Sequence, residues 1–288
     1  MHKVSTSFAV LGHEISELRM VVERKTGILL DATDDQLSSL IAEKMDELHL
    51  NSPAELLERL QASNTECENF VEPLLDGTPG FFAVPEAFDA LTNVALPELT
   101  RNLNSTEPGV RSLRFLSAGC ATGEEPYSIA ISLCEALNGG AGNWNIRIVG
   151  TDIRRNALGV AERGLYPESA FGRVPRRLVQ AYFAKVGQHF LAKPRLRNLV
   201  TFTFMNLVDP GYIGRFHCIF CMNVLSRFSL SHRTALIQRL HLYLEPGGFL
   251  FLGEGEKLPA CETTFQPVKS VSYVIHRKPR AATAAVGR

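Results

Sequence analysis

The segment from Phe115 to Ser128 constrains the fold more than any other part of the chain. A short apolar run, Phe115 to Ala118, leads into a turn that contains Gly119 and Gly123. Apolar residues then recur at helical spacing from Ile129 to Leu137. A strand, a tight glycine turn and a helix in this order open a mononucleotide-binding half of a doubly wound sheet. We therefore predict an α/β fold built around this unit.

Two adjacent carboxylates at the start of the predicted helix narrow the choice of ligand. Loops that bind phosphate leave bare backbone N–H groups at a helix N-terminus, where the positive end of the helix dipole meets the anion. Glu124 and Glu125 place negative charge there and would repel a pyrophosphate. A nucleoside that carries positive charge and no phosphate fits better, and S-adenosylmethionine (SAM) is such a ligand. Alternatively, the two residues only complement the dipole, worth up to about 1 kcal/mol.

Strands and helices alternate from Arg114 onward, which predicts an open, mainly parallel sheet. We expect strands near 114–118, 146–151, 200–204, 216–222, 248–252 and 271–276, and helices near 124–137, 154–163 and 231–244, the last ended by Pro246-Gly247-Gly248. Asp152 follows the second strand, where an acid can accept hydrogen bonds from ribose hydroxyls. Alternatively, Asp152 caps the next helix. Asn206 and Asn223 end later strands at the same edge of the sheet, where ligands collect.

The first hundred residues carry helical patterns and no catalytic constellation. Thr33 to Gln36 and Ser52 to Glu55 are candidate capping boxes, and a linking helix is expected from Val84 to about Leu103. The polar stretch Asn104 to Gly109 marks a boundary. We predict a helical domain over 8–103, an α/β domain over 110–278 and a disordered tail over 279–288.

Composition excludes several classes of protein. A formal net charge of zero argues against bulk binding to nucleic acid or to an anionic membrane. No apolar run approaches the ~20 residues that span a bilayer, and the first seven residues lack the apolar core of a signal peptide. Six scattered cysteines fit a reduced, cytoplasmic protein. Cys218 and Cys221 lie three apart on a predicted strand and therefore point to opposite faces, so we expect no metal there.

Basic residues dominate between 154 and 200, where ten Arg and Lys face only Glu162 and Glu168. Such a patch can dock an acidic partner, and it can equally be a solvated face.

Five motifs follow one another in an order that belongs to a known family. They are Ser117 to Ser128, Gly150 to Ile153, Met205 to Leu207, Ile219 to Leu225 and Leu244 to Gly253. Together they resemble the bacterial chemotaxis receptor methyltransferases, the CheR family, and the resemblance runs from about residue 10 to 278. It implies an N-terminal helical domain and a Rossmann-like SAM-dependent methyltransferase domain. It also implies methylation of glutamate side chains on the cytoplasmic helices of a chemoreceptor-like protein.

The resemblance assigns residues to the cofactor site. By that resemblance the SAM-contacting positions are Glu125, Asp152, Asn206, Leu207, Asn223 and Val224, and we also predict Gly119 and Ala121 of the glycine turn as cofactor-binding residues. It also places a small β-subdomain over about 182–200. This segment looks shorter than in members that bind a receptor's C-terminal pentapeptide, so we do not expect that tether.

Several positions depart from the family pattern. Members usually read N-x-T-x-F-F-R where this chain has Gly77 to Ala83. The Asn, the Thr and the Arg of that pattern are therefore missing here. Met222 replaces a usual Arg, and Arg227 replaces a usual Tyr. The second helix is usually rich in Arg, but residues 34–47 carry five acids and one Lys. Like charges there would oppose an acidic receptor helix.

Methyl transfer to a carboxylate requires alignment of the carboxylate with the methyl group. It needs no general base, because a glutamate side chain is already ionised at pH 7. We hypothesise that Arg227 supplies the guanidinium that Ala83 lacks; alternatively, Arg227 is a solvent-facing residue at a helix start. The leading function is protein-glutamate O-methyltransferase. The alternative is a non-catalytic module of this fold that regulates or scaffolds signalling. A nicotinamide-dependent dehydrogenase is the third possibility, weakened by the Glu pair and by the lack of a third glycine.

Overall fold

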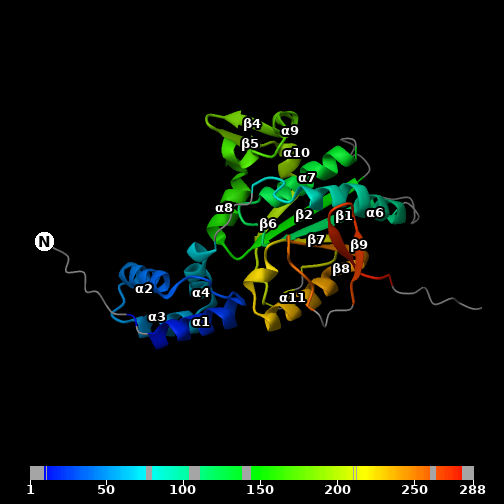
Figure 1. The fold of residues 1–288 in the computed structure, drawn as a ribbon. Coiled ribbons are helices and arrows are strands. Elements are labelled where there is room, and N and C mark those ends of the chain that lie inside the picture. The colour runs from blue at the N-terminus through cyan, green and yellow to red at the C-terminus, as the bar shows by residue number, and fades with distance from the viewer. Residues whose placement is uncertain are drawn as a thin grey trace, which may run out of the picture.

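The computed structural model describes residue 10 and residues 12–75, 80–103, 111–137, 144–209, 211, 213–259 and 264–280. Its centre is a seven-stranded sheet in the order β6-β2-β1-β7-β8-β10-β9 (Figure 1). The strands are β1 (Arg111–Ala118), β2 (Trp144–Asp152), β6 (Val200–Phe204), β7 (Phe216–Cys221), β8 (Leu244–Leu252), β9 (Gln266–Lys269) and β10 (Val274–Arg277). The pairs among β6, β2, β1, β7 and β8 are parallel, and β10 is antiparallel to β8 and β9. The predicted Rossmann-like α/β fold is confirmed.

The strand order creates a switch point beside β1. The chain runs from β1 to β2 and β6 on one side and returns to β7 and β8 on the other. Ligands of open α/β sheets bind outside the carboxyl ends of the strands at such a point. The predicted site residues follow β1, β2, β6 and β7, so the topology brings them to one edge.

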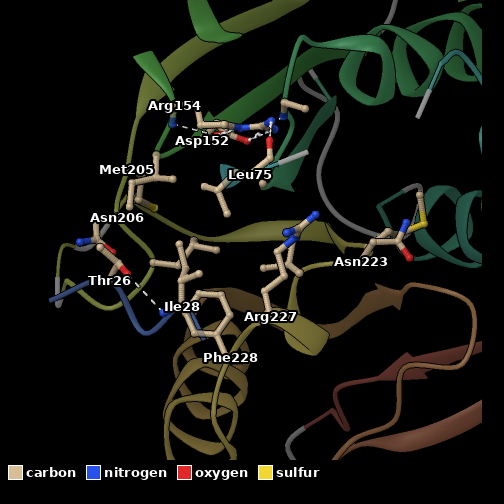
Figure 2. Close-up of a pocket in the computed structure, with 16 residues that line it drawn as sticks. Thr26, Ile28, Leu75, Asp152, Arg154, Met205, Asn206, Asn223, Arg227 and Phe228 are labelled. Atoms are coloured by element: carbon tan, nitrogen blue, oxygen red, sulfur yellow. Dashed lines mark hydrogen bonds and ion pairs between the residues drawn. The ribbon is translucent and has the colours of Figure 1, made fainter. Parts of the chain in front are cut away.

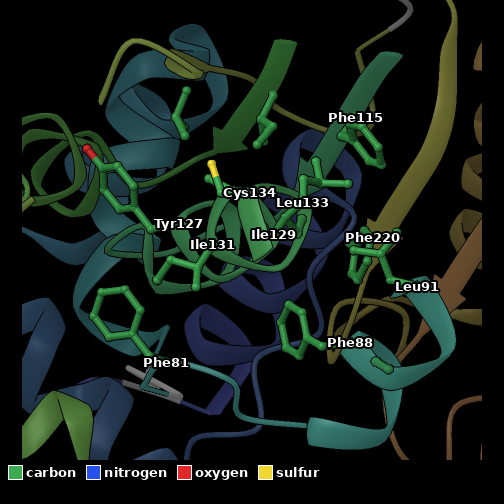
Figure 3. Close-up of a cluster of buried hydrophobic side chains, with 14 of the residues drawn as sticks. Phe81, Phe88, Leu91, Phe115, Tyr127, Ile129, Ile131, Leu133, Cys134 and Phe220 are labelled. Carbon is green, nitrogen blue, oxygen red and sulfur yellow. The ribbon is translucent and has the colours of Figure 1, made fainter. Parts of the chain in front are cut away.

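Helices cover both faces of the sheet, with α7 (Glu124–Ala136) on one and α11 (Leu230–Tyr243) on the other (Figure 1). We call the buried cluster around Phe115 and Ile129 the α7-side core and the cluster around Leu116 and Ile237 the α11-side core. Figure 3 shows the α7-side core, in which Phe88 lies close to Phe220. Cys218 belongs to the first core and Cys221 to the second, as strand alternation predicts.

Helices of the N-terminal part pack against the α11 side. They are α1 (Gly12–Thr26), α2 (Asp34–Leu48), α3 (Pro53–Ala62) and α4 (Asn64–Val71), followed by the 3-10 turn η1 (Glu72–Leu74). Thr33 and Gln36 form both bonds of a capping box. Ser52 accepts from the Glu55 N–H, but the Glu55 carboxylate accepts from Asn51 instead of Ser52, so the second predicted box is only half formed. Buried residues of these helices join the α11-side core, so the two parts share one apolar interior.

The predicted linking helix is divided by a π-helical turn. It consists of α5 (Pro85–Ala90), η2 (Leu91–Ala95) and α6 (Leu96–Leu103). Pro97 has no N–H for the carbonyl of Asn93, and its ring would clash with that carbonyl in a regular α-helix. The wider π turn accommodates this proline. Residues of α5 and η2 belong to the α7-side core. The predicted boundary at 104–109 lies outside the described residues.

A second, antiparallel sheet of order β3-β5-β4 projects beyond α7 (Figure 1). Its strands are β3 (Leu165–Pro167), β4 (Phe183–Val186) and β5 (His189–Ala192), accompanied by the 3-10 turn η4 (Glu168–Phe171) and helices α9 (Arg176–Tyr182) and α10 (Pro194–Arg197). We expected this β-subdomain over 182–200, but its third strand comes from 165–167, before α9. The three-residue strand is too short to give a periodic signal. Phe81 joins this sheet to the loop before α5 by stacking on Phe171 at 4.6 Å between ring centroids.

The segment Pro246-Gly247-Gly248 does not end a helix, contrary to our expectation. Helix α11 ends at Tyr243, and β8 begins at the next residue. Phe216 pairs with Leu244 and Cys218 with Phe249, so β8 holds three more residues than β7 between these pairs. Glycine is required at position 248 of this bulge, because a Cβ on Gly248 would lie 2.9 Å from two backbone oxygens. In the part of the chain that the structure describes, no helix could cross a bilayer.

Candidate functional site

A cavity of about 210 Å³ opens at the carboxyl edge of the central sheet (Figure 2). Its walls come from the ends of β1, β2, β6 and β7 and from the N-terminal helices. Eight of the nine residues predicted for the site line it: Gly119, Ala121, Asp152, Asn206, Leu207, Asn223, Val224 and Arg227. The ninth, Glu125, is not among the lining residues. The strand topology therefore gathers the predicted residues, while contact with a cofactor stays a prediction.

The glycine turn joins β1 to β2 and to the floor of the cavity. Gly119 has a φ of +77°, and a Cβ there would lie 2.5 Å from the Val224 side chain, so only glycine fits. The N–H groups of Gly119 and Cys120 both donate to the Thr151 carbonyl, at 2.8 and 2.9 Å. Ala121 has a φ of +50°, a conformation that a non-glycine residue adopts at a cost. The turn is thus held tightly beside the end of β2.

Asp152 lies 5% exposed in the wall of the cavity and accepts four hydrogen bonds. The Ala121 N–H reaches Oδ2 at 2.7 Å, and the Arg154 N–H reaches Oδ1 at 2.9 Å. The Arg154 guanidinium adds bonds from Nε to Oδ1 at 3.0 Å and from Nη2 to Oδ2 at 3.4 Å. The alternative role as a helix cap is wrong. Helix α8 (Arg155–Arg163) has no side-chain cap at Arg154, and Glu72 accepts the Asn156 N–H instead.

Asn206 ties the cavity to the N-terminal helices. Its amide nitrogen donates to the Lys25 carbonyl at 2.9 Å and to Oε1 of Glu68 at 3.4 Å. Its amide oxygen accepts the Val208 N–H at 3.3 Å. Burial raises the pKa of the Glu68 carboxyl, and the Asn206 bond opposes that shift. The polar atoms of Asn206 are therefore engaged within the protein, so this residue shapes the cavity.

Glu125 lies beside β1 and outside the cavity lining. Its Oε1 accepts the Ser117 hydroxyl at 2.6 Å. Burial raises the pKa of Glu125 to about 7, with the Ser117 bond lowering it and the Glu256 charge raising it. Burial likewise raises the pKa of Glu124, whose carboxylate accepts the Thr122 hydroxyl. The expected repulsion of pyrophosphate assumed two fully ionised groups, and burial makes it weaker than we expected.

The loop after β7 forms the opposite wall, and a carboxylate from the loop after β8 holds it in place. Glu256 accepts the N–H groups of Asn223, Ser226 and Gly253 at 2.9, 2.9 and 2.8 Å. A Cβ on Gly253 would lie 2.5 Å from Asn223, so glycine permits the close approach of the two loops. We missed Glu256 in the sequence, although it ends the glycine-rich segment 253–256.

Arg227 ends the 3-10 turn η5 (Leu225–Arg227) and lines the cavity. Its carbonyl accepts the Leu29 N–H at 2.8 Å, and the neighbouring Phe228 pairs with Ile28, so the turn is anchored to the N-terminal part. Figure 2 shows its guanidinium directed into the cavity, between Leu75 and Asn223. Arg227 is also exposed, so its position fits both the proposed role at the cavity and the alternative of a solvent-facing side chain.

Eight further lining residues were not predicted as site residues. Thr26, Ile28 and Leu75 come from the N-terminal part, Ile153 and Arg154 follow Asp152, and Met205, Met222 and Phe228 each adjoin a predicted residue. Patterns along the chain give no signal for the first three, because only tertiary packing brings them to the sheet edge. For Arg154, the available signal was its position two residues after Asp152, the acid predicted to bind the ribose hydroxyls. Within the described residues, no cluster of three His, Cys, Asp or Glu side chains could hold a metal ion.

Comparison with known proteins places the chain in a functional context. The family model for the CheR methyltransferase, SAM-binding domain, matches residues 78–274. Chemotaxis protein methyltransferase 1 of Pseudomonas aeruginosa is 32% identical over 266 residues, covering 90% of this chain and 95% of the relative. Chemotaxis protein methyltransferase of Borreliella burgdorferi is 29% identical, covering 95% and 96%. The probable biofilm formation methyltransferase WspC of P. aeruginosa is 28% identical, covering 91% and 62%.

Among solved structures, the chain is similar to the N-methyltransferase NodS from Bradyrhizobium japonicum in complex with S-adenosylhomocysteine. The TM-score is 0.38 and the sequence identity 15%, over 67% of this chain and 87% of the other. Magnesium protoporphyrin IX methyltransferase from Synechocystis with bound SAM gives a TM-score of 0.37 at 16% identity, over 74% and 90%.

Proposed function

Because this chain belongs to the CheR methyltransferase family and carries its SAM-binding domain, we propose that it methylates glutamate side chains of a chemoreceptor-like signalling protein. The products are a glutamate methyl ester and S-adenosylhomocysteine. The observation that carries this proposal is the Arg227 guanidinium in the cavity wall, on the loop that also supplies Asn223 and Val224. A guanidinium can hold a carboxylate by two parallel hydrogen bonds, which suits an acidic acceptor.

The lining residues fit SAM in their chemistry. The Asp152 carboxylate suits a ribose diol, provided that the Arg154 guanidinium withdraws from it. Leu207, Met222 and Val224 offer apolar walls to an adenine ring, and the missing Cβ of Gly119 lets the Val224 side chain pack against the glycine turn. When bound, SAM supplies an electrophilic methyl group on its sulfonium.

The protein's own task is to align the acceptor and exclude water. A glutamate side chain with a pKa near 4.3 is ionised at pH 7 and needs no general base. Arg227 would hold that carboxylate beside the methyl group, and the Glu256 clamp would fix the loop from Asn223 to Arg227. Alignment of this kind can lower a barrier by several kcal/mol. Ala83, which replaces the Arg of the family pattern, does not line the cavity. Its carbonyl accepts a hydrogen bond from Nη1 of Arg173 at 2.9 Å.

The partner we propose is the cytoplasmic helical region of a chemoreceptor-like protein, which places this protein in the cytoplasm. Helix α2 exposes Asp35, Glu43 and Asp46, whereas its one lysine, Lys44, forms an ion pair with Glu47. An acidic receptor helix would be repelled by this face. We therefore expect the partner to approach by another surface.

A non-catalytic module is the second candidate. It is favoured by the filled hydrogen-bonding positions of Asp152 and by the residues that replace the family motif at 77–83, of which 77–79 lie outside the described part. Such a protein would retain the fold and regulate or scaffold a signalling complex.

Transfer of a labelled methyl group separates the two candidates. Purified protein and labelled SAM are incubated with cytoplasmic fragments of chemoreceptors from the same organism, each prepared with glutamate or with glutamine at its methylation sites. We expect label on the glutamate fragments alone, released as methanol by base because the product is an ester. Equal labelling of both forms would refute the glutamate substrate. SAM binding without transfer to any fragment would favour the non-catalytic module.

A further inference from the structure

We propose that Arg154 competes with the cofactor's ribose for Asp152 and thereby sets the affinity of the site for SAM. The inference rests on the proposed cofactor site and concerns a side chain that the family motifs do not assign. It requires that the guanidinium occupy the hydrogen-bonding positions that a ribose diol would use. The contacts around Asp152 meet that requirement.

The Asp152 carboxylate has no spare acceptor position. An ionised carboxylate offers about four lone-pair sites. Two are taken by the backbone N–H groups of Ala121 and Arg154, which the turn and the start of α8 hold in place. The other two are taken by Nε and Nη2 of Arg154. Two ribose hydroxyls can therefore bond to Asp152 only if the guanidinium leaves it.

The same guanidinium also reaches across the cavity. Its Nη1 donates to the Leu75 carbonyl at 2.7 Å, and Figure 2 shows the side chain lying between Asp152 and Leu75. The Arg154 side chain is 14% exposed. Because a guanidinium is a rigid planar fork, withdrawal from Asp152 must also disturb the bond to Leu75. Ribose binding is thus coupled to the end of the N-terminal helices.

The size of the cavity agrees with this arrangement. Ligand pockets usually enclose about 300–1,000 Å³. The cavity here is about 210 Å³ with the Arg154 side chain in its wall. Movement of that side chain enlarges the site where a ribose would lie.

The neighbouring arginine provides a matched control. The Arg155 guanidinium lies 3.7 Å from the centre of the Phe204 ring, and Arg155 is not among the cavity-lining residues. Removing Arg155 deletes the same charge one residue away without freeing Asp152. Any general electrostatic effect of losing an arginine here appears in both variants.

The experiment is calorimetric titration of the whole protein with SAM and, separately, with S-adenosylhomocysteine. We expect Arg154→Ala to bind both ligands about tenfold more tightly than wild type, because a ribose hydroxyl then satisfies an acceptor that is otherwise left unpaired. The gain should be equal for the two ligands, since they share the ribose. A purely electrostatic gain would favour SAM, which carries the additional sulfonium charge. Arg155→Ala should bind like wild type.

Two further variants make the result decisive. Adding Arg154→Ala to Asp152→Ala should bring no gain, because the contested acceptor is gone. Arg154→Met keeps the apolar stem and should also tighten binding, which separates the effect from a packing defect. Unchanged or weaker binding by both Arg154 variants, with wild type binding normally, overturns this inference alone. If wild type and all variants bind neither ligand, the proposed cofactor site fails as well.

Discussion

The backbone N–H of Asn223 donates a hydrogen bond of 2.9 Å to Oε2 of Glu256, 33 residues further along the chain. Asn223 follows β7 and Glu256 follows β8, which are parallel neighbours, so the bond joins two loops at the carboxyl edge of the sheet. The same carboxylate holds Ser226 and Gly253. It therefore fixes the loop that brings Arg227 to the cavity.

We predict that Glu256→Ala lowers methyl transfer more than it lowers affinity for S-adenosylhomocysteine. Three backbone donors lose their acceptor, and a hydrogen bond to a charged group makes a net contribution of about 1.5–3 kcal/mol. The loop should then move relative to the acceptor, reducing turnover by about tenfold or more. Labelled-methyl assays and calorimetry on the same preparation measure the two quantities. Glu254→Ala, an exposed acid in the same loop, is the control. Equal losses in both variants would contradict the clamp.

Arg227→Ala should reduce methyl transfer to a protein acceptor by about 10- to 100-fold, the equivalent of about 1.4–2.7 kcal/mol. Affinity for S-adenosylhomocysteine should change little, because the proposed role is to hold the acceptor carboxylate. Arg227→Lys should recover only part of the rate, since an ammonium cannot form the two-bond fork. Lys257→Ala removes an exposed charge nearby and should leave the rate unchanged. If turnover and acceptor affinity both survive Arg227→Ala, the assignment is withdrawn.

The sequence predicts the central sheet well, because its signals are local. The run from Phe115, the turn at Gly119 and the periodicity after Ile129 specify β1, its turn and α7 without knowledge of the rest. Asp152 and Asn223 could be placed at one edge because the carboxyl ends of parallel strands meet there. The order of elements along the chain was enough for that step.

The features we missed depend on contacts between distant segments. Leu75 meets Arg154 across 79 residues, and Asn206 meets Glu68 across 138. No periodicity encodes such pairs. Glu125 was placed correctly on α7, but it does not line the cavity and accepts the Ser117 hydroxyl instead, which a pattern of residue types does not reveal.

The contact between Glu68 and Asn206 leads to a prediction about stability. We expect Glu68→Ala to lower the free energy of unfolding by about 1–3 kcal/mol, because it leaves the buried Asn206 amide short of an acceptor. Glu68→Gln should be close to wild type. The amide keeps an oxygen for Asn206. It also removes a carboxyl whose pKa is raised by burial, which disfavours the charged form. Urea unfolding measures both variants. Glu66→Ala, which breaks an exposed ion pair with Arg59, should cost less than about 1 kcal/mol. A destabilised Glu68→Gln would mean that the negative charge itself is required.

The last prediction concerns pH and Glu125, whose pKa is raised from 4.5 to about 7 by burial. Between these two values the folded protein keeps a proton that the unfolded chain has lost. Stability must therefore fall as pH rises from about 4.5 to about 7, and it levels off above that. The decrease is at most about 3.5 kcal/mol, since each pKa unit corresponds to about 1.4 kcal/mol.

Glu125→Gln should abolish this part of the pH dependence, because the amide can still accept the Ser117 hydroxyl and carries no charge to desolvate. Urea unfolding at pH 5 and pH 8 should show a smaller loss of stability in the variant than in wild type. Glu135→Gln is the contrasting control. The pKa of Glu135 is lowered by Arg177 and Tyr182, so its stabilising contribution is lost only as pH falls below about 4.5 and is the same at pH 5 and pH 8. An identical pH dependence in wild type and Glu125→Gln would show that Glu125 is ionised in the folded protein across this range.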